Sequence, residues 1–316
     1  MALVKGAYSK RMSLKETNTK IVKEIAAELG FMHCGISKSG FLNQEASRLE
    51  KWLTDGFQGK MEYMNNHFDK RLDTTLLVPE SKSVISVLLN YYPDQKQEKN
   101  IPKISKYAYG MDYHGVIKDK LFSYMDLIQE RIGDVSGRVF VDSAPVMDKA
   151  WAKKAGLGWL GKNGNLINPK KGSFFFIAEL IVDLELIPDG PIKDYCGTCT
   201  RCMDACPTDA LNTPYVVDGS KCISYLTIEL KDELIPSSFK NKTEGWAFGC
   251  DICQDVCPWN RFSISHELEA FKLNESLINL NKQEWEELSD QQFSVIAKNS
   301  PIKRTKLKGM KRNVNF

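Results

Sequence analysis

Apolar residues recur at helical spacing through much of the N-terminal half of the chain. In residues 14–30, Ile21, Ile25 and Leu29 share one helical face, and Ser13 stands where its hydroxyl can cap the first turn. Further helices are predicted at 44–56, 113–132 and 144–156.

Short runs rich in β-branched and aromatic residues lie between these helices and predict strands. Residues 83–91 form the clearest run, followed by 138–142 and by one or two strands within 174–186. Cys34 begins a further apolar run, where a packed core thiol is the expected role. Strands that alternate with helices predict an α/β fold.

The pattern changes near residue 190, where cysteines and prolines replace the regular periodicity. Residues 215–218 predict part of a ferredoxin-like hairpin, and helices resume beyond Trp259, including 282–288, which Asn281 can cap. We therefore expect an α/β domain over 1–188, a cysteine-rich module over 189–262 and a helical C-terminal segment with a basic tail over 263–316.

Eight of the nine cysteines fall in the cysteine-rich module. The first run has the spacing C-x2-C-x2-C-x3-C-P, and the second has C-x2-C-x3-C-P, with Cys222 alone between them. The first is the bacterial ferredoxin pattern, in which three cysteines hold one four-iron cluster and the fourth reaches to the other. This rule assigns Cys196, Cys199, Cys202 and Cys257 to cluster one, and Cys206, Cys222, Cys250 and Cys253 to cluster two. Cys222 enters by counting, because two clusters require eight thiolates.

Two other uses of the cysteines fit the sequence less well. Zinc sites favour isolated C-x2-C pairs over runs that end in Cys-Pro. Disulfides require an oxidising compartment, whereas residues 1–6 contain no apolar core of a signal peptide. We therefore predict two 4Fe-4S clusters in a cytoplasmic protein.

Composition places the chain among ordinary globular proteins, with 316 residues, 42% of them hydrophobic and 26% charged. Acidic residues interrupt the apolar run 173–187, so no segment is predicted to cross a bilayer, and we expect a monomer that does not engage membranes. The net charge is only +3, but basic residues gather in two stretches. One comprises Lys303, Arg304, Lys306, Lys308, Lys311 and Arg312; the other comprises Lys149, Lys153, Lys154, Lys162, Lys170 and Lys171. Each could contact phosphates or simply face solvent.

A second candidate for chemistry is Asp142, which follows a predicted strand and precedes a predicted helix. Active groups are common at such positions in α/β folds. Asp142 and Ser143 could instead support the start of the helix, as dipole partner and cap. The glycines from Gly158 to Gly161 would let the backbone approach something bulky and flat. Neither a P-loop nor a G-x-G-x-x-G fingerprint is present.

Several segments together resemble the epoxyqueuosine reductases, the cobalamin-dependent enzymes of queuosine tRNA modification. They are 106–114, 141–145, 158–163, 224–229, 300–304 and the two cysteine runs. The resemblance implies a cobalamin-binding α/β domain fused to a ferredoxin-like two-cluster module. It also implies a reaction, the reductive removal of the epoxide oxygen from epoxyqueuosine at the tRNA wobble position to give queuosine.

The resemblance further implies an electron route and a set of site residues. An external low-potential donor, such as a flavodoxin or a ferredoxin, would reduce the clusters, which would reduce cobalamin. Asp142 becomes the proton donor, since an opening epoxide develops an alkoxide that an acid must protonate. Neither His67 nor His114 is expected to ligate cobalt, because no ligand motif surrounds either residue. The residues expected near cobalamin are Tyr107, Asp142, Gly158, Lys162, Asn163, Thr227 and Ile228.

tRNA is the partner that the resemblance implies. The two basic stretches would grip its anticodon arm while the modified base is splayed into the site. Many family members continue with helical repeats beyond the point where this chain stops, so the tail from Pro301 to Arg312 is expected to carry more of that contact. The open alternatives are a reductive dehalogenase-like cobalamin and iron–sulfur oxidoreductase acting on a small molecule, a non-catalytic electron carrier, and a tRNA-binding protein with structural metal.

Overall fold

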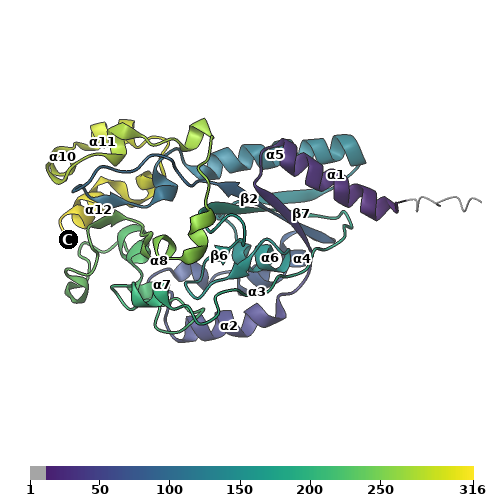
Figure 1. Ribbon diagram of the computed structural model, residues 1–316, viewed down its shortest axis with the longest axis horizontal. Helices are drawn as coiled ribbons and strands as arrows, with labels where there is room; N and C mark the ends of the chain where they lie inside the picture. Colours follow the sequence, from purple (N-terminus) through teal and green to yellow (C-terminus); the bar gives the residue numbers. More distant parts are fainter. Residues whose placement is uncertain (1–11) are drawn as a thin grey trace, which may run out of the picture.

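The centre of the molecule is a four-stranded sheet, seen here in a computed structural model that describes residues 12–316 (Figure 1). The strand order is β1-β2-β7-β4, and every neighbouring pair is antiparallel. The expectation that the chain has no signal peptide rests on residues 1–6, which lie outside the described residues. The strands are β1 (His33–Lys38), β2 (Ser83–Asn90), β4 (Gly137–Phe140) and β7 (Phe175–Val182).

Two long helices cover one face of this sheet, α1 (Leu14–Glu28) and α5 (Tyr113–Ile132) (Figure 1). Alternate residues of β7, such as Phe176 and Leu180, point into the core that these helices share with the sheet. The Ser13 hydroxyl accepts a hydrogen bond in the first turn of α1, so the predicted cap is confirmed. The predicted range of α5 is also confirmed.

Shorter helices cover the opposite face. Trp151 of α6 is fully buried there and packs with Leu49, Leu72 and Ile181 in a second layer of core. Cys34 lies in β1 against the Tyr124 hydroxyl, and burial raises the pKa of its thiol to about 11, as expected for a packed core thiol. The helices of this face are α2 (Asn43–Thr54), α3 (Phe68–Leu72), α4 (Thr74–Leu77) and α6 (Asp148–Lys154).

The cysteine-rich module is built mostly from loops and short helices. Its strand β8 (Trp246–Phe248) pairs in parallel with β3 (Lys103–Ile104), which belongs to the N-terminal half. The module also contains α7 (Arg201–Asp204), α8 (Ile252–Asp255) and a π-helix, η4 (Tyr225–Glu229). A small hairpin, β5 (Trp159–Leu160) and β6 (Leu166–Ile167), lies beside α6.

The C-terminal helices share a core with residues from both other parts of the chain. Ile104, Phe248, Trp285 and Met310 are all fully buried in this core. The predicted limits 1–188, 189–262 and 263–316 stay predictions, and this core crosses them. Asn281 caps α10 as predicted. The helices are α9 (Glu275–Ile278), α10 (Lys282–Glu287), α11 (Asp290–Ile296) and α12 (Lys306–Val314).

Single 3-10 turns complete the described elements. They are η1 (Glu62–Met64), η2 (Lys106–Ala108), η3 (Gly219–Lys221), η5 (Ser237–Phe239), η6 (Pro258–Phe262), η7 (Glu269–Phe271) and η8 (Pro301–Thr305). Within residues 12–316, none of the helices has the length and apolar character needed to cross a membrane.

Candidate active site and cluster centre

All nine cysteines lie within the described residues, and each is a half-buried free thiol. The disulfide alternative therefore finds no support. No three His, Cys, Asp or Glu side chains between residues 12 and 316 are close enough to hold one metal ion.

The charges acting on each thiol reveal which cysteines are neighbours. Burial raises the pKa of Cys202, and the charges of Cys257 and Cys196 add to this effect. Burial likewise raises the pKa of Cys257, with further contributions from Cys196 and Cys199. Cys257 therefore lies among the thiols of the first run, which supports the assignment of these four residues to cluster one.

The remaining thiols form a second and deeper group. Burial raises the pKa of Cys253, and the charges of Cys222, of Cys202 from the first group and of Cys206 act in the same direction. Burial also raises the pKa of Cys250, which Cys222 and Cys253 raise further. Asp251, beside this group, is only 1% exposed. Cys222 thus lies beside the other three cysteines assigned to cluster two. This position supports its assignment as the eighth ligand, which the sequence indicated only by the number of cysteines.

Two side chains of the glycine-rich turn hold the loops that carry the cysteines. Lys162 Nζ donates to the carbonyl oxygens of Gly197 at 2.8 Å and Cys199 at 3.0 Å. Asn163 Nδ2 donates to the carbonyl oxygen of Cys253 at 3.2 Å. The structure therefore directs both side chains toward the cysteine loops, one at each thiol group.

Gly158 is required by the hairpin itself. A Cβ atom at this position would lie 2.4 Å from the carbonyl oxygen of Ile167, so only glycine allows β5 and β6 to approach so closely. The structure thus gives a reason for Gly158 that needs no bound ligand.

Asp142 lies two residues beyond β4, at the centre of a tight turn. Its backbone φ is 49°, in the left-handed region. The Ser143 N–H donates to the Val141 carbonyl oxygen at 2.5 Å, which closes the turn. Such a conformation is costly for a residue other than glycine and persists mainly where the surroundings enforce it, often at functional sites.

Helix α6 begins later than the sequence predicts. It begins at Asp148, with Met147 at the cap position and no side-chain cap bond. Pro145 disfavours helical conformation in the residue before it, which delays the helix. The alternative that Asp142 and Ser143 support the helix start is therefore wrong.

Two consecutive residues at the start of α5, Tyr113 and His114, approach the Asp142 carboxylate. The Tyr113 hydroxyl donates to Asp142 Oδ2, and His114 Nε2 lies 3.7 Å from the same oxygen. His114 Nδ1 lies 2.7 Å from Asp112 Oδ1, and this hydrogen bond raises the pKa of His114 against the opposing effect of burial. The Tyr113 ring stacks on Phe176 of β7 with ring centroids 4.1 Å apart, which fixes the position of its hydroxyl.

Two more tyrosines lie within electrostatic reach of Asp142. Burial raises the pKa of Tyr107, and the charge of Asp142 adds to this. Burial also raises the pKa of Tyr63, with contributions from Glu229 and Asp142. Arg304 Nη2 lies 2.8 Å from Glu229 Oε1, so the ion pair joins the tail to this group. Tyr63 belongs to a single turn without any motif, so the sequence offered no signal for it.

Lys149 lies between Asp142 and the second thiol group. Burial lowers the pKa of Lys149, and the charges of Cys253, Asp142 and Cys222 oppose that effect. Its Nζ donates to the carbonyl oxygen of Gly164 at 2.9 Å. The Lys149 ammonium group therefore interacts electrostatically with both Asp142 and the thiols of the second group.

Thr227 and Ile228 lie in the π-helix η4, a rare element that is frequently found at functional sites. Thr227 is fully buried; its hydroxyl donates to the Ile223 carbonyl oxygen at 2.7 Å and accepts from the Gly249 N–H at 3.0 Å. Ile228 packs in the C-terminal core. Both side chains therefore support the π-helix from inside, which places Glu229 beside Arg304.

A buried pair of acids next to the Asp142 turn was not anticipated. Glu179 of β7 is fully buried and stands opposite Phe140, the last residue of β4. Burial raises the pKa of Glu179 well above its usual range, and burial raises that of Asp148 to about 6. From the sequence, Glu179 was only an interruption in an apolar run.

The basic tail is folded against the rest of the protein. Helix α12 and turn η8 contact β8 and the π-helix. Lys308 pairs with Glu233 at 2.7 Å, and Arg312 donates to backbone carbonyl groups. Lys303 and Lys306 are exposed and form no ion pair in the described part of the chain. Only part of the tail is therefore free to contact phosphates.

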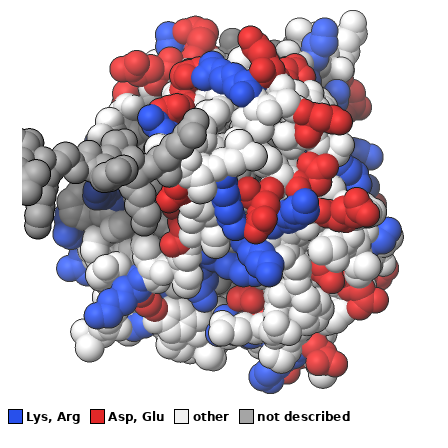
Figure 2. Space-filling view, turned by 90° about the vertical axis from the view of Figure 1, so that its right-hand side faces the viewer, with Lys and Arg blue, Asp and Glu red and all other residues white. Residues whose placement is uncertain are grey.

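The second basic stretch does not form one continuous surface. Lys149 and Lys162 donate to backbone carbonyl groups, and Lys154 Nζ lies 4.6 Å from the centre of the Trp151 ring. On the face at the α1 end of the molecule, basic and acidic side chains are interspersed (Figure 2). Neither the second basic stretch nor the face in Figure 2 therefore shows a broad phosphate-binding surface.

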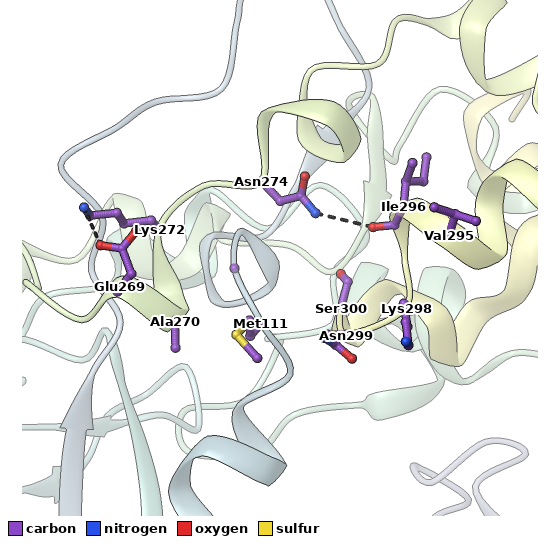
Figure 3. Close-up of a pocket in the computed structure, with 11 residues that line it drawn as sticks. Met111, Glu269, Ala270, Lys272, Asn274, Val295, Ile296, Lys298, Asn299 and Ser300 are labelled. Carbon is purple, nitrogen blue, oxygen red and sulfur yellow. Dashed lines mark hydrogen bonds and ion pairs between the residues drawn. The ribbon is translucent and has the colours of Figure 1, made fainter.

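A cavity of about 330 Å³ lies between the segment before α5 and the C-terminal helices (Figure 3). None of the predicted site residues line it. Its charged pair, Lys272 and Glu269, is joined at 2.6 Å, and Asn274 Nδ2 bonds to the Ile296 carbonyl oxygen at 3.4 Å. Because these polar groups already have partners, the chemistry is more plausibly placed at Asp142.

Residues 195–260 match the family described as a 4Fe-4S double cluster binding domain, so the protein is a two-cluster iron–sulfur protein. Residues 71–143 match the family described as epoxyqueuosine reductase QueG, DUF1730. An epoxyqueuosine reductase of Leadbetterella byssophila is 64% identical over 298 residues, which cover 94% of this chain and 97% of that protein. One of Cellulophaga algicola is 59% identical over 305 residues, covering 96% and 99%. This chain belongs to the epoxyqueuosine reductase family.

Solved structures agree with this assignment. An epoxyqueuosine reductase with an epoxyqueuosine-modified tRNA-Tyr stem loop superposes with a TM-score of 0.86 at 28% identity, over 93% of this chain and 79% of that one. The enzyme of Bacillus subtilis, with its catalytic aspartate loop swung out of the active site, gives 0.85 at 27% identity, with the same coverage. A reductive dehalogenase gives 0.52 at 17% identity over 98% of this chain and 40% of that one, which shows a shared fold alone.

Proposed function

We propose that this protein reduces epoxyqueuosine in the wobble position of tRNA to queuosine, using cobalamin and two 4Fe-4S clusters. The observation that carries the proposal is membership of the epoxyqueuosine reductase family at 64% identity across nearly the whole chain. The position of Lys149, which feels the charges of both Asp142 and the deeper thiol group, supports it. The dehalogenase alternative rests on fold similarity alone and is weaker.

The residues present fit the proposed cofactors. Each thiol group has four members, which is the ligand number of a four-iron cluster. Tyr107, Lys149 and the π-helix surround the region between Asp142 and the deeper group, where cobalamin would be held. Cobalamin supplies a strongly reducing metal centre when bound. Gly158, Lys162 and Asn163 are proposed to act on the cluster loops that they support.

Asp142 is proposed to deliver the proton that the leaving epoxide oxygen requires. The Tyr113 hydroxyl orients the carboxyl group through its hydrogen bond to Oδ2. His114 is proposed to return a proton to Asp142, since Nε2 faces the same oxygen while Asp112 holds the opposite ring nitrogen. The strained turn at Asp142 would let the acid approach and leave, in keeping with the loop that is swung out in the Bacillus subtilis relative.

tRNA is proposed as the substrate, as the relative with a bound stem loop suggests. The neutral epoxide offers little binding energy, so the anticodon arm must supply most of it. We further propose that the enzyme acts as a monomer in the cytoplasm, where tRNA is found and thiols stay reduced for cluster assembly.

The test is turnover of tRNA that contains epoxyqueuosine, using anaerobically reconstituted protein and a chemical reductant. Queuosine should appear only when cobalamin is supplied, which nucleoside analysis by mass spectrometry can follow. The proposed function would be refuted if the yield of queuosine were the same without cobalamin, or if no queuosine formed when cobalamin was present.

Replacement of Lys303 and Lys306 by glutamine should weaken tRNA binding and reduce its salt dependence. Each lost phosphate contact lowers the slope of log K against log salt by about 0.7 to 0.9, because fewer counterions are released. Anisotropy titration of a labelled anticodon stem loop at several salt concentrations measures both quantities.

The matched control replaces Lys20 of α1 and Lys82, the residue before β2, by glutamine, since both are exposed lysines outside the tail. This pair should leave the slope unchanged. Equal slopes for both variants would mean that the tail does not contact tRNA.

A further inference from the structure

A cluster of four aromatic rings links cluster one to the protein surface. Trp159 Nε1 donates to the Cys196 thiol at 3.4 Å. The Trp159 ring centroid lies 5.2 Å from that of Tyr195 and 5.0 Å from that of Trp259, and Trp259 lies 5.9 Å from Phe262. Tyr195 is 49% exposed and Phe262 is 36% exposed. This aromatic patch therefore reaches solvent directly beside the cluster-one thiols.

Two arginines flank the aromatic patch. The Arg261 guanidinium lies 4.3 Å from the Phe262 ring centre and 5.8 Å from that of Trp259. Arg201 and Arg261 both line a hollow of about 440 Å³ that also exposes part of Cys257. Within the described chain, neither arginine forms an ion pair with a carboxylate. Both charges are thus available to a partner.

The nearby acidic residues are already engaged. Asp194 accepts from the Cys196 N–H at 2.7 Å and from the Tyr215 hydroxyl at 2.7 Å. Asp255, which lines the same hollow, pairs with Lys106 at 2.6 Å. Arg261 Nη1 donates only to the Pro258 carbonyl oxygen at 3.3 Å. The two arginines are therefore charges on this surface that have no carboxylate partner in the described chain, and they favour an acidic partner.

The two thiol groups differ in their access to solvent. Residues 193–195 and 197–198, which flank Cys196, are exposed. Phe248 and Asp251, which flank Cys250, are 0% and 1% exposed. Electrons from outside therefore reach cluster one first. The sequence contains neither a P-loop nor a dinucleotide fingerprint, which favours a protein donor over a nucleotide bound by this chain.

We propose that the aromatic patch, together with Arg201 and Arg261, is the docking surface for an acidic electron-transfer protein that carries a low-potential one-electron centre at its own surface. The proposal rests on the proposed function, which consumes two electrons. Two successive one-electron transfers oxidise the donor twice. With two protons they convert the epoxide into an alkene and water. Exposed aromatic rings suit a small, short-lived interface, and the arginines steer the acidic partner toward it.

The test compares the unaltered protein with the double variant Arg201→Glu, Arg261→Glu, using an acidic flavodoxin as the probe. Affinity for oxidised flavodoxin, measured by calorimetry without any turnover, should fall about tenfold or more at low salt and lose most of its salt dependence. Queuosine formation driven by reduced flavodoxin should fall in parallel. Turnover driven by titanium(III) citrate, which needs no docking surface, should stay within about twofold.

The control replaces two exposed lysines outside the patch, Lys20→Glu and Lys82→Glu, and should leave flavodoxin affinity unchanged. Unchanged affinity in the arginine variant would overturn the proposal. If the glutamate variant also lost titanium-driven turnover, the milder double variant Arg201→Gln, Arg261→Gln is tested instead. Its flavodoxin affinity and its two kinds of turnover are then compared with those of the unaltered protein. Absence of titanium-driven turnover in the unaltered protein would instead count against the proposed function.

Discussion

Replacing Asp142 by asparagine should lower queuosine formation by about two to four orders of magnitude, the range that general acid catalysis contributes. Asparagine has nearly the shape of aspartate and can still accept from the Tyr113 hydroxyl, but it cannot release a proton to the departing oxygen. Iron and cobalamin contents should equal those of the unaltered protein. Single-turnover assays under a chemical reductant, with metal analysis of the same samples, measure both.

Asp119→Asn is the matched control, since it is an exposed aspartate on the same helix as Tyr113 and should have no effect. His114→Gln removes the group facing Asp142 Oδ2 but keeps the acid itself, so it should slow turnover less than Asp142→Asn. Full activity in Asp142→Asn would show that another group supplies the proton.

Replacing Cys222 by serine should halve the iron content, from about eight to about four irons per chain, because cluster two loses one of its four thiolates. Turnover should be abolished, since the deeper thiol group is the one whose charges reach Lys149 together with that of Asp142. Colorimetric iron analysis after anaerobic reconstitution gives the stoichiometry, and electron paramagnetic resonance of the reduced protein shows whether one or two clusters remain.

Cys34→Ser provides the matched control. Cys34 is also a half-buried free thiol, but it packs in the sheet against Tyr124 and lies in neither thiol group. This variant should retain about eight irons. Retention of all eight irons in Cys222→Ser, or zinc in place of iron, would contradict the ligand assignment.

The cysteine chemistry could be predicted from the sequence because ligand spacing is a local property of the chain. Cys196, Cys199 and Cys202 share one short loop, and their spacing alone indicates a cluster. Cys222 was accessible only by counting, and its place beside Cys250 and Cys253 follows from tertiary packing.

The region around Asp142 could be predicted only in part. The apparent helix start at Ala144 allowed a capping role for Asp142, whereas the resemblance made Asp142 the proton donor. The structure removes the capping role, because α6 begins at Asp148. Tyr63 and Glu179 carry no local signal, because each reaches the site through contacts between distant segments. The charges of the tail were visible, but the partners of Arg304 and Lys308 were not.

The pairing of β3 with β8 has a consequence for how substrate reaches Asp142. Lys103 and Ile104 come from the N-terminal half, yet they are hydrogen-bonded to a strand of the cysteine-rich module, and the C-terminal core packs over both. A hinge opening between the N-terminal half and the cysteine-rich module would break backbone hydrogen bonds and expose that core to water. Because the Asp142 side chain is 53% exposed, a nucleotide can reach it without such an opening, and the two halves stay joined while it binds.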